Sequence, residues 1–169
     1  PVFWTGRHRS GAWGSAAAGA VTTDLFVESL DAASERVHDG DRLVPLRRRR
    51  ETIALRWGDP VTLEVSETPR GPLLAPLLDR EREPLALAWT GAAPGDGVAA
   101  FLRVAHASSA AQLRTALATH HEPVLAVLFA DADGAGGLQL AGSVPRRAQG
   151  TSLVPVPARG DGFLWQGFL

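Results

Sequence analysis

The pattern of hydrophobic and polar positions divides the chain into many short apolar or alternating runs and one longer helical stretch. Short runs rich in Val, Ile, Leu, Phe or Trp and bounded by Gly, Pro, Asp or Ser are typical of strands. Such runs lie at 2–4, 12–13, 24–30, 52–57, 61–66, 85–90, 124–130 and 138–141. The run at 124–130 is continuously apolar, so we expect a strand that is buried on both faces.

One stretch follows the helical period instead. Apolar residues recur at helical spacing from Val98 to Ala105, and the pair Ser108-Ser109 provides an N-cap for a second helical run. Pro123 disfavours helical geometry at the preceding residue and ends this stretch. We therefore predict a helical segment over 98–119 in an α+β fold built from antiparallel sheets.

Turn residues separate the predicted strands. Gly58-Asp-Pro60 joins two strand-like runs into a hairpin, and Asp131-Ala-Asp-Gly134 joins two others. This placement makes Asp131 and Asp133 turn residues rather than a catalytic or calcium-binding pair. The segments 6–11 and 31–40 are polar, and we expect a turn in the first and a loop or a single helical turn in the second.

Composition narrows the chemistry. The 169 residues predict one domain, the net charge is −1, and all 17 basic residues are Arg. Without Cys, disulfides, thiolate catalysis and thiolate metal sites are excluded. No run of apolar residues is long enough for a membrane span. Residues 1–4 lack a basic region followed by an apolar core, so they predict no signal peptide, and the compartment is undetermined.

Two charged clusters have alternative interpretations. Arg47–Arg50 is either a nucleic-acid patch or the solvated edge of a strand, and alternation of side chains along a strand favours the edge. His120-His121-Glu122 suggests metal ligation, but adjacent helical residues diverge too much to chelate one ion. We therefore interpret the histidines as a polar helix end and expect neither nucleic-acid nor membrane partners.

The stretch Gly6-Arg-His-Arg-Ser-Gly-Ala-Trp-Gly-Ser-Ala-Ala17, continued by Asp24-Leu-Phe-Val-Glu28, resembles the penicillin acylase family of N-terminal-nucleophile hydrolases. In that family a Gly-His-Asn turn leads into a Trp-Gly strand and then an Asp-led strand. Further segments resemble the family in the same order: 39–46, 51–53, 69–72, 86–90, 100–103, 129–134, 141–145, 153–157 and 165–168. The resemblance therefore covers nearly the whole chain.

This resemblance implies that residues 1–169 are a single partial domain, the central segment of an acylase large chain within an αββα sandwich. The family's nucleophile and its oxyanion Asn would lie outside this segment. It implies hydrolysis of an acyl–amine amide in a β-lactam side chain, an acyl-homoserine lactone or an acyl-peptide, with this segment inactive alone. Its partners would be the remaining acylase segments or a second copy. Family members are often periplasmic or secreted. A non-catalytic binding or scaffold domain descended from the family is the alternative.

The same resemblance implies site residues. The backbone N–H of Ala17 would help to bind the oxyanion, and Trp13, Ser15 and Ala16 would shape the substrate pocket. Asp24 matches a calcium ligand of the family, but Val21 stands where a second carboxylate is expected. A hard cation requires several oxygen ligands. We therefore expect no cofactor and no metal, with Asp24 serving as a structural residue.

Overall fold

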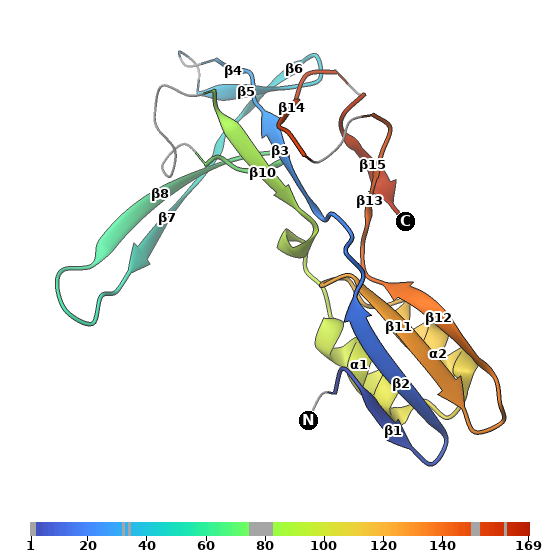
Figure 1. Ribbon diagram of the computed structural model, residues 1–169. Coiled ribbons are helices and arrows are strands. Elements are labelled where there is room, and N and C mark those ends of the chain that lie inside the picture. The colour runs from blue at the N-terminus through green and yellow to red at the C-terminus, as the bar shows by residue number, and fades with distance from the viewer. Residues whose placement is uncertain (1–2, 32, 34, 75–82, 150–152, 161) are drawn as a thin grey trace. The chain divides into compact units, whose positions relative to one another are not determined.

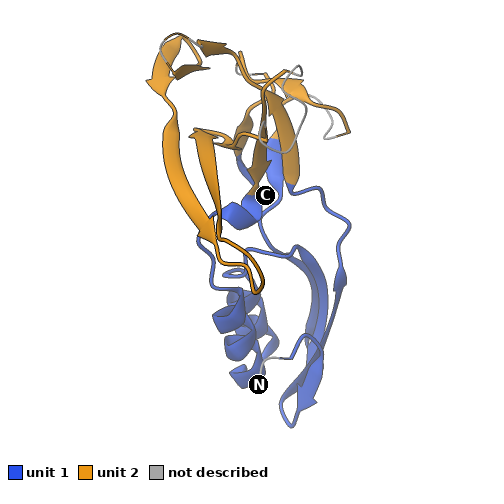
Figure 2. Ribbon diagram, turned by 90° about the vertical axis from the view of Figure 1, so that its left-hand side faces the viewer, with its two compact units in different colours: residues 1–22, 90–146, 167–169 blue, residues 23–89, 147–166 orange. Residues whose placement is uncertain are grey.

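The computed structural model describes residues 3–31, 33, 35–74, 83–149, 153–160 and 162–169. The chain forms two compact units, coloured separately in Figure 2. Unit 1 comprises residues 1–22, 90–146 and 167–169, and unit 2 comprises residues 23–89 and 147–166. Each unit is built from separate stretches of sequence, and whether residues 1–169 behave as one domain stays a prediction.

Unit 1 is a sheet with helices on one face. Its antiparallel strands β1 (Gly6–His8), β2 (Gly11–Ala17), β11 (Leu125–Asp131) and β12 (Gly136–Ala141) lie in that order. Helices α1 (Gly97–His106) and α2 (Ala110–Leu117) follow a short 3₁₀ turn, η1 (Thr90–Ala92), and cover one side of the sheet (Figure 1). Asp96 caps α1 by accepting from the Ala99 N–H, and Ser109 caps α2 by accepting from the Gln112 N–H, which confirms the predicted serine cap.

The core of unit 1 lies between the helices and the sheet. Phe101 and Leu117 of the helices pack with Trp13, Val127 and Phe129 of the strands. Removing these side chains from water supplies most of the stabilisation of such a two-layer unit, at about 25 cal/mol for each Å² of apolar surface buried.

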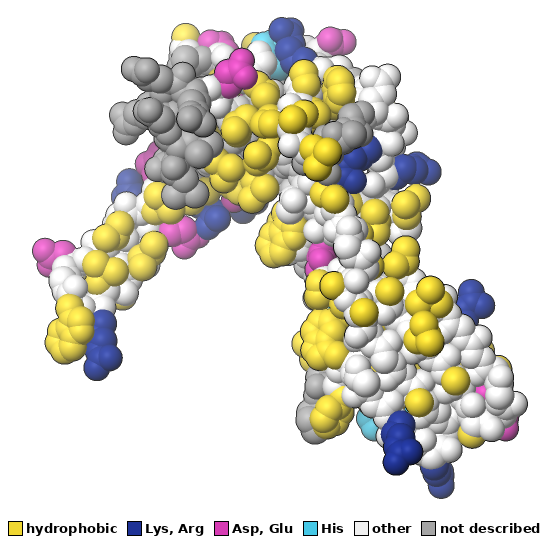
Figure 3. All heavy atoms as spheres, in the orientation of Figure 1, with side chains coloured by type: hydrophobic (Ala, Val, Ile, Leu, Met, Phe, Trp, Pro, Cys, Tyr) yellow, Lys and Arg dark blue, Asp and Glu magenta, His cyan; other side chains and the backbone are white. Residues whose placement is uncertain are grey.

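The opposite face of this sheet is open, which corrects the expectation that residues 124–130 are buried on both faces. Leu125, Val127 and Phe129 are buried, but Leu128 between them is 64% exposed. On β12, Leu138 is 66% exposed and Leu140 is 61% exposed. Figure 3 shows apolar side chains on this face. Within the described part of unit 1, helices cover only one side of the sheet, so this continuous apolar run leaves Leu128 and Ala130 exposed and Ala126 partly exposed.

Unit 2 consists of small sheets. In the first, β3 (Thr23–Val27) lies between antiparallel β10 (Leu85–Trp89) and parallel β14 (Val156–Pro157). The second contains β4 (Leu30–Asp31), β5 (Arg36–Asp39) and β6 (Arg42–Pro45), and the third contains β7 (Arg47–Ile53), β8 (Val61–Thr68) and β9 (Gly71–Pro72). A core around Phe26 and Ala86 supports the first sheet. Strands β13 (Pro145–Arg147) and β15 (Trp165–Phe168) form a further pair.

The structure corrects three sequence expectations. Phe3 and Trp4 are not in a strand, and pairing begins at Gly6 instead. Residues 31–40 are not only loop, because they contain β5, which pairs with β4 at residues 30–31. The first predicted hairpin exists, but its strands begin at Arg47 and end at Thr68, and residues 54–60 form a longer connection than Gly58-Asp-Pro60 alone.

The four consecutive arginines of β7 lie on an edge strand of their sheet. Arg49 pairs with Glu51 and Glu67, while Arg48 contacts Glu35 at 2.8 Å and Glu64 at 3.5 Å. The hydrogen bonds that Arg49 donates to Glu67 and, with a smaller effect, to Glu51 outweigh the effect of partial burial and raise the pKa of Arg49. Carboxylates thus offset much of this positive charge, as expected for a solvated edge strand.

Candidate active-site wall on strand β2

The residues implied by the family resemblance lie on or beside β2 at the middle of the unit 1 sheet. Strand β11 pairs with the whole of β2, from Gly11 opposite Asp131 to Ala17 opposite Leu125. On the other side, β1 pairs with β2 only as far as Trp13. Residues 14–17 therefore have a strand neighbour on one side only, within the part of the chain that the structure describes.

The direction of the Ala17 N–H follows from the ladder. The Ala18 N–H donates to the Val124 carbonyl at 3.2 Å, so it points toward the β11 side. Successive N–H groups of a strand point to opposite sides, because hydrogen-bonded and non-hydrogen-bonded pairs alternate. The Ala17 N–H therefore points away from β11, toward the side on which β1 has ended. Ala17 is also an exposed residue.

The three proposed pocket residues do not share one wall. Trp13 is buried in the core, and its Nε1–H donates to the Phe3 carbonyl at 3.1 Å. The Ser15 hydroxyl donates to the Trp4 carbonyl at 2.6 Å, on the same face of the strand. Ala16 is exposed and, by strand alternation, lies on the opposite face. Trp13 and Ser15 anchor residues 3–4, and the pocket roles of all three stay predictions.

The turn before β2 has a clear physical basis. A side chain at Gly6 would place Cβ 2.7 Å from the Trp13 ring, so a residue larger than glycine does not fit there. The His8 ring lies tilted beside the Trp13 ring with the ring centroids 5.9 Å apart, and its Nδ1 accepts the Ser10 N–H at 3.1 Å. The Gly-x-His pattern thus shapes the β1–β2 hairpin that positions Ala17.

Asp24 is surrounded by hydrogen-bond donors and not by the oxygen ligands of a calcium site. Its carboxylate is 5% exposed and accepts hydrogen bonds from Arg147 Nε at 2.8 Å and from Trp165 Nε1. A hard cation requires six to eight oxygen ligands, whereas these neighbours are N–H donors and one of them is positively charged. The residues present do not fit calcium.

Of the two histidines after α2, His121 is exposed and His120 is buried, so the sequence interpretation of a solvated helix end is wrong for His120 only. Helix α2 ends at Leu117, and His120 beyond it is only 4% exposed. Its Nε2 lies 2.7 Å from the Pro123 carbonyl, and its ring packs edge-on against Phe101. His121 instead contacts the Ser143 hydroxyl. Among the described residues, no group of three or more His, Asp or Glu is placed to hold a metal.

Asp131 connects the second hairpin to the start of α2. Its Oδ2 accepts the Ala110 N–H at 2.9 Å, and its Oδ1 accepts the N–H groups of Asp133 and Ala135. The Ala110 hydrogen bond has the largest effect on the carboxyl pKa, and together with the turn N–H groups it outweighs burial, so the pKa of Asp131 is lowered. The turn role predicted for Asp131 and Asp133 is confirmed.

Replacing Asp131 with Asn should change how stability depends on pH. A lowered native-state pKa gives stability that is present above the unfolded-state value of about 3.9 and is lost as the pH falls through the native-state pKa. We therefore expect wild type to exceed Asp131→Asn in stability at pH 6, and the difference to shrink at pH 3. Urea unfolding at both pH values measures this. Asp133→Asn is the matched control, and an Asp131→Asn difference that is equal at both pH values would contradict the assignment.

Sequence reasoning did not foresee the buried ion cluster of unit 2. The Arg70 guanidinium donates from Nε to Glu28 Oε1 at 2.8 Å and from Nη2 to Glu28 Oε2 at 2.6 Å. It also contacts Asp39 at 3.1 Å and the His38 carbonyl at 2.7 Å. Glu28 and Arg70 each lie in a segment that resembles the family pattern, and this was the only hint that the two residues matter. That they pair with each other is seen only in the folded structure.

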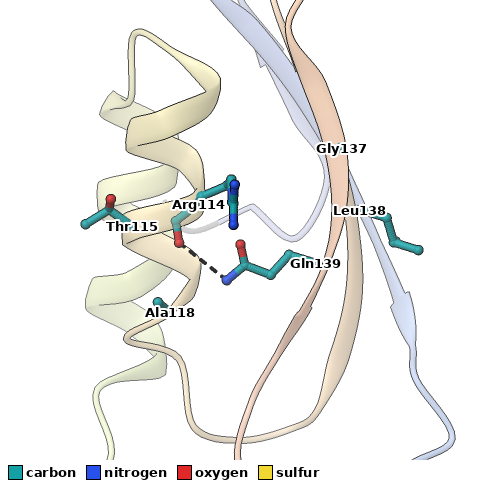
Figure 4. Close-up of a pocket in the computed structure, with 6 residues that line it drawn as sticks. All are labelled: Arg114, Thr115, Ala118, Gly137, Leu138 and Gln139. Atoms are coloured by element: carbon teal, nitrogen blue, oxygen red, sulfur yellow. Dashed lines mark hydrogen bonds between the residues drawn. The ribbon is translucent and has the colours of Figure 1, made fainter. Parts of the chain in front are cut away.

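Hollows also lie away from β2 among the residues that the structure describes. One of about 530 Å³ lies between α2 and β12, where Gln139 points to the helix and donates to the Arg114 carbonyl, while Leu138 points to the open face (Figure 4). Another, of about 310 Å³, lies in unit 2. Its lining residues are mostly apolar: Phe26, Asp39, Pro69, Arg70, Ala88, Trp89, Leu164 and Trp165. Such a lining favours an apolar ligand group.

Comparisons with known proteins agree on one family. The penicillin amidase family model matches residues 1–169. An acyl-homoserine lactone acylase QuiP of Pseudomonas syringae pv. tomato is 27% identical over 186 residues, which cover 99% of this chain and 21% of that protein. The QuiP of Pseudomonas aeruginosa is 27% identical over 176 residues, covering 93% of this chain and 20% of that protein. This chain thus spans about a fifth of the length of these relatives.

The fold comparison gives the same result. A thermostable penicillin G acylase from Alcaligenes faecalis superposes with a TM-score of 0.80 and 20% identity, covering 99% of this chain and 30% of that structure. This likeness shows that the antiparallel sheets and helices have the arrangement of a penicillin acylase segment. None of the described helices is long and apolar enough to span a membrane. Since the family model matches the chain from its first residue to its last, the chain belongs to the penicillin amidase family.

Proposed function

We propose that this chain is the central segment of an acylase large chain and supplies one wall of the site that cleaves an acyl–amine amide. The observation that carries the proposal is the Ala17 N–H, which points away from β11 at the end of β2 in an exposed position. The whole-chain family match supports it.

In this proposal the Ala17 N–H stabilises charge as it develops. A nucleophilic hydroxyl outside these residues attacks the amide carbon, and the carbonyl electron pair moves onto oxygen. A backbone donor held by a sheet is already oriented when that negative charge forms, and one such donor typically contributes roughly 10²–10³ in rate. The amine then leaves with a proton, and water releases the acyl group.

An acyl-homoserine lactone is the first substrate candidate, because the two curated relatives described above carry that activity in their names. A β-lactam side chain, as in the penicillin G acylase, and an acyl-peptide are the alternatives. All three contain an amide between an acyl group and an amine, so the role of Ala17 is the same in each.

The open face of the unit 1 sheet is evidence for a binding partner. Leu128, Leu138 and Leu140 form a row of exposed apolar side chains opposite the helices. Apolar patches of this kind mark surfaces that are buried in an assembly. We propose that the remaining acylase segments cover this face, and that the isolated chain self-associates through it.

The isolated 169-residue chain should be inactive. Incubation with N-octanoyl-homoserine lactone or a chromogenic phenylacetyl anilide should release no more amine than buffer does, because the nucleophile lies outside these residues. The complete reading frame that contains the segment is the positive control. Turnover by the isolated chain would overturn the proposal. A folded but inactive complete protein would favour the alternative of a non-catalytic scaffold.

A further inference from the structure

Asp24 poses an electrostatic problem that the fold must solve. Asp24 is the second residue of β3, and it is only 5% exposed. A buried carboxylate is costly unless a positive charge and hydrogen bonds compensate it. The groups around Asp24 therefore show whether a metal ion or the protein's own side chains stabilise the buried carboxylate.

The compensating groups come from the chain. Arg147 on β13 places Nε 2.8 Å from Asp24 Oδ2, and Trp165 on β15 donates its indole N–H to the same oxygen. Asp24 and Arg147 lie 123 positions apart in the sequence, and their side chains are 5% and 18% exposed. A charge-assisted hydrogen bond in such surroundings is stronger than a surface pair, because little water screens it.

These contacts conflict with a divalent cation. A calcium ion bound to the Asp24 carboxylate would lie within a few ångströms of the guanidinium, and two like charges at that distance repel strongly where solvent screening is weak. Val21 adds no carboxylate that would offset this repulsion. The chain already holds one full positive charge at the carboxylate.

We propose that the Arg147 guanidinium serves as the built-in cation of the Asp24 position. The Arg147–Asp24 ion pair connects β13 to β3, and the hydrogen bond from Trp165 connects β15 to the same carboxylate. These contacts between β3, β13 and β15 therefore do not require calcium, although Asp24 matches a calcium ligand in the family pattern. This inference concerns stability and metal dependence, so it stands or fails separately from the proposed catalytic role of Ala17.

The test is thermal unfolding of the 169-residue chain in calcium chloride and in EDTA. The wild type should show the same Tm in both. Arg147→Met keeps the length of the side chain but removes the charge, and it should lower the Tm by roughly 6–12 °C, since it leaves a buried carboxylate without its partner. Arg159→Met, at an exposed arginine of the same unit, is the matched control and should leave the Tm unchanged.

Two results would overturn the proposal. One is a wild-type Tm that rises with calcium or falls with EDTA, and the other is an Arg147→Met Tm equal to that of Arg159→Met. If Arg147→Met does not fold, calcium titration of the wild type by calorimetry decides the question, because specific heat of binding contradicts the proposal and its absence supports it. Arg147→Lys, which keeps the charge, should retain a Tm closer to wild type than Arg147→Met does.

Discussion

Replacing Ala17 with proline in the complete acylase is expected to lower kcat about 10²–10³-fold. Proline has no N–H, so the substitution removes the one donor that β2 directs away from β11 at this position. The partner strand should tolerate the change, because the Ala17 N–H faces the side on which β1 has already ended. Initial rates with the preferred amide substrate, at saturating concentration, measure the effect.

Ala17→Gly is the matched control, since it keeps the N–H and removes only a methyl group. It should retain most of the wild-type kcat. Both variants should have a Tm close to wild type, which separates a catalytic loss from unfolding. An Ala17→Pro enzyme that is folded and retains wild-type kcat would show that this N–H does not bind the oxyanion.

Replacing Arg70 with methionine is expected to destabilise unit 2 by about 3–5 kcal/mol. The Glu28 side chain is fully buried and the Arg70 side chain is 7% exposed, so the substitution leaves a buried carboxylate without its counter-charge. Burial opposes the charge of Arg70, but the hydrogen bonds that it donates to Glu28 and the attraction of the Glu28 and Asp39 carboxylates outweigh burial and raise the pKa of the guanidinium. Urea unfolding of the 169-residue chain measures the loss.

Arg48→Met provides the comparison for Arg70. Arg48 also contacts two carboxylates, but its side chain is 44% exposed, so its loss should cost about 1 kcal/mol or less. Arg70→Lys keeps the charge but loses the two-pronged contact with Glu28, and an intermediate loss is expected. Equal stabilities of the Arg70→Met and Arg48→Met variants would contradict a structural role for the buried cluster.

Sequence patterns predicted the elements whose signals are local. The helical spacing from Val98 to Ala105, the serine cap of α2 and the Asp131 turn each depend on neighbours within a few residues, and each was found. The paired strands β11 and β12 were also found where turn residues separate apolar runs. The family resemblance extended this to the arrangement of the sheets, which the superposition confirms.

Features that depend on distant partners were missed. The burial of 124–130 was overestimated, because periodicity does not reveal whether one or two layers cover a sheet. Histidine is a polar residue type, so the sequence predicted an exposed His120. In the structure the Phe101 ring and the Pro123 carbonyl contact its ring. The partners of Glu28 and Asp24 lie 42 and 123 positions away, beyond any local pattern.

In the candidate site too, local features were predicted from the sequence and features that depend on the fold were not. The motif located Ala17 at a strand end, and the ladder then supplied the direction of its N–H, which no sequence pattern contains. Trp13, Ser15 and Ala16 are adjacent in the motif, but strand alternation places Ala16 on the opposite face from the other two. The motif therefore places these residues on one strand, but it does not show which of them face the same side.

The measurement that tests the central claim most directly is a crystal structure of the complete acylase with a transition-state analogue, such as an alkylphosphonate or boronic acid. We expect an analogue oxygen about 2.7–3.1 Å from the Ala17 nitrogen, in line with its N–H. An analogue whose oxygen is bound entirely by other donors, with no hydrogen bond from Ala17, would contradict it.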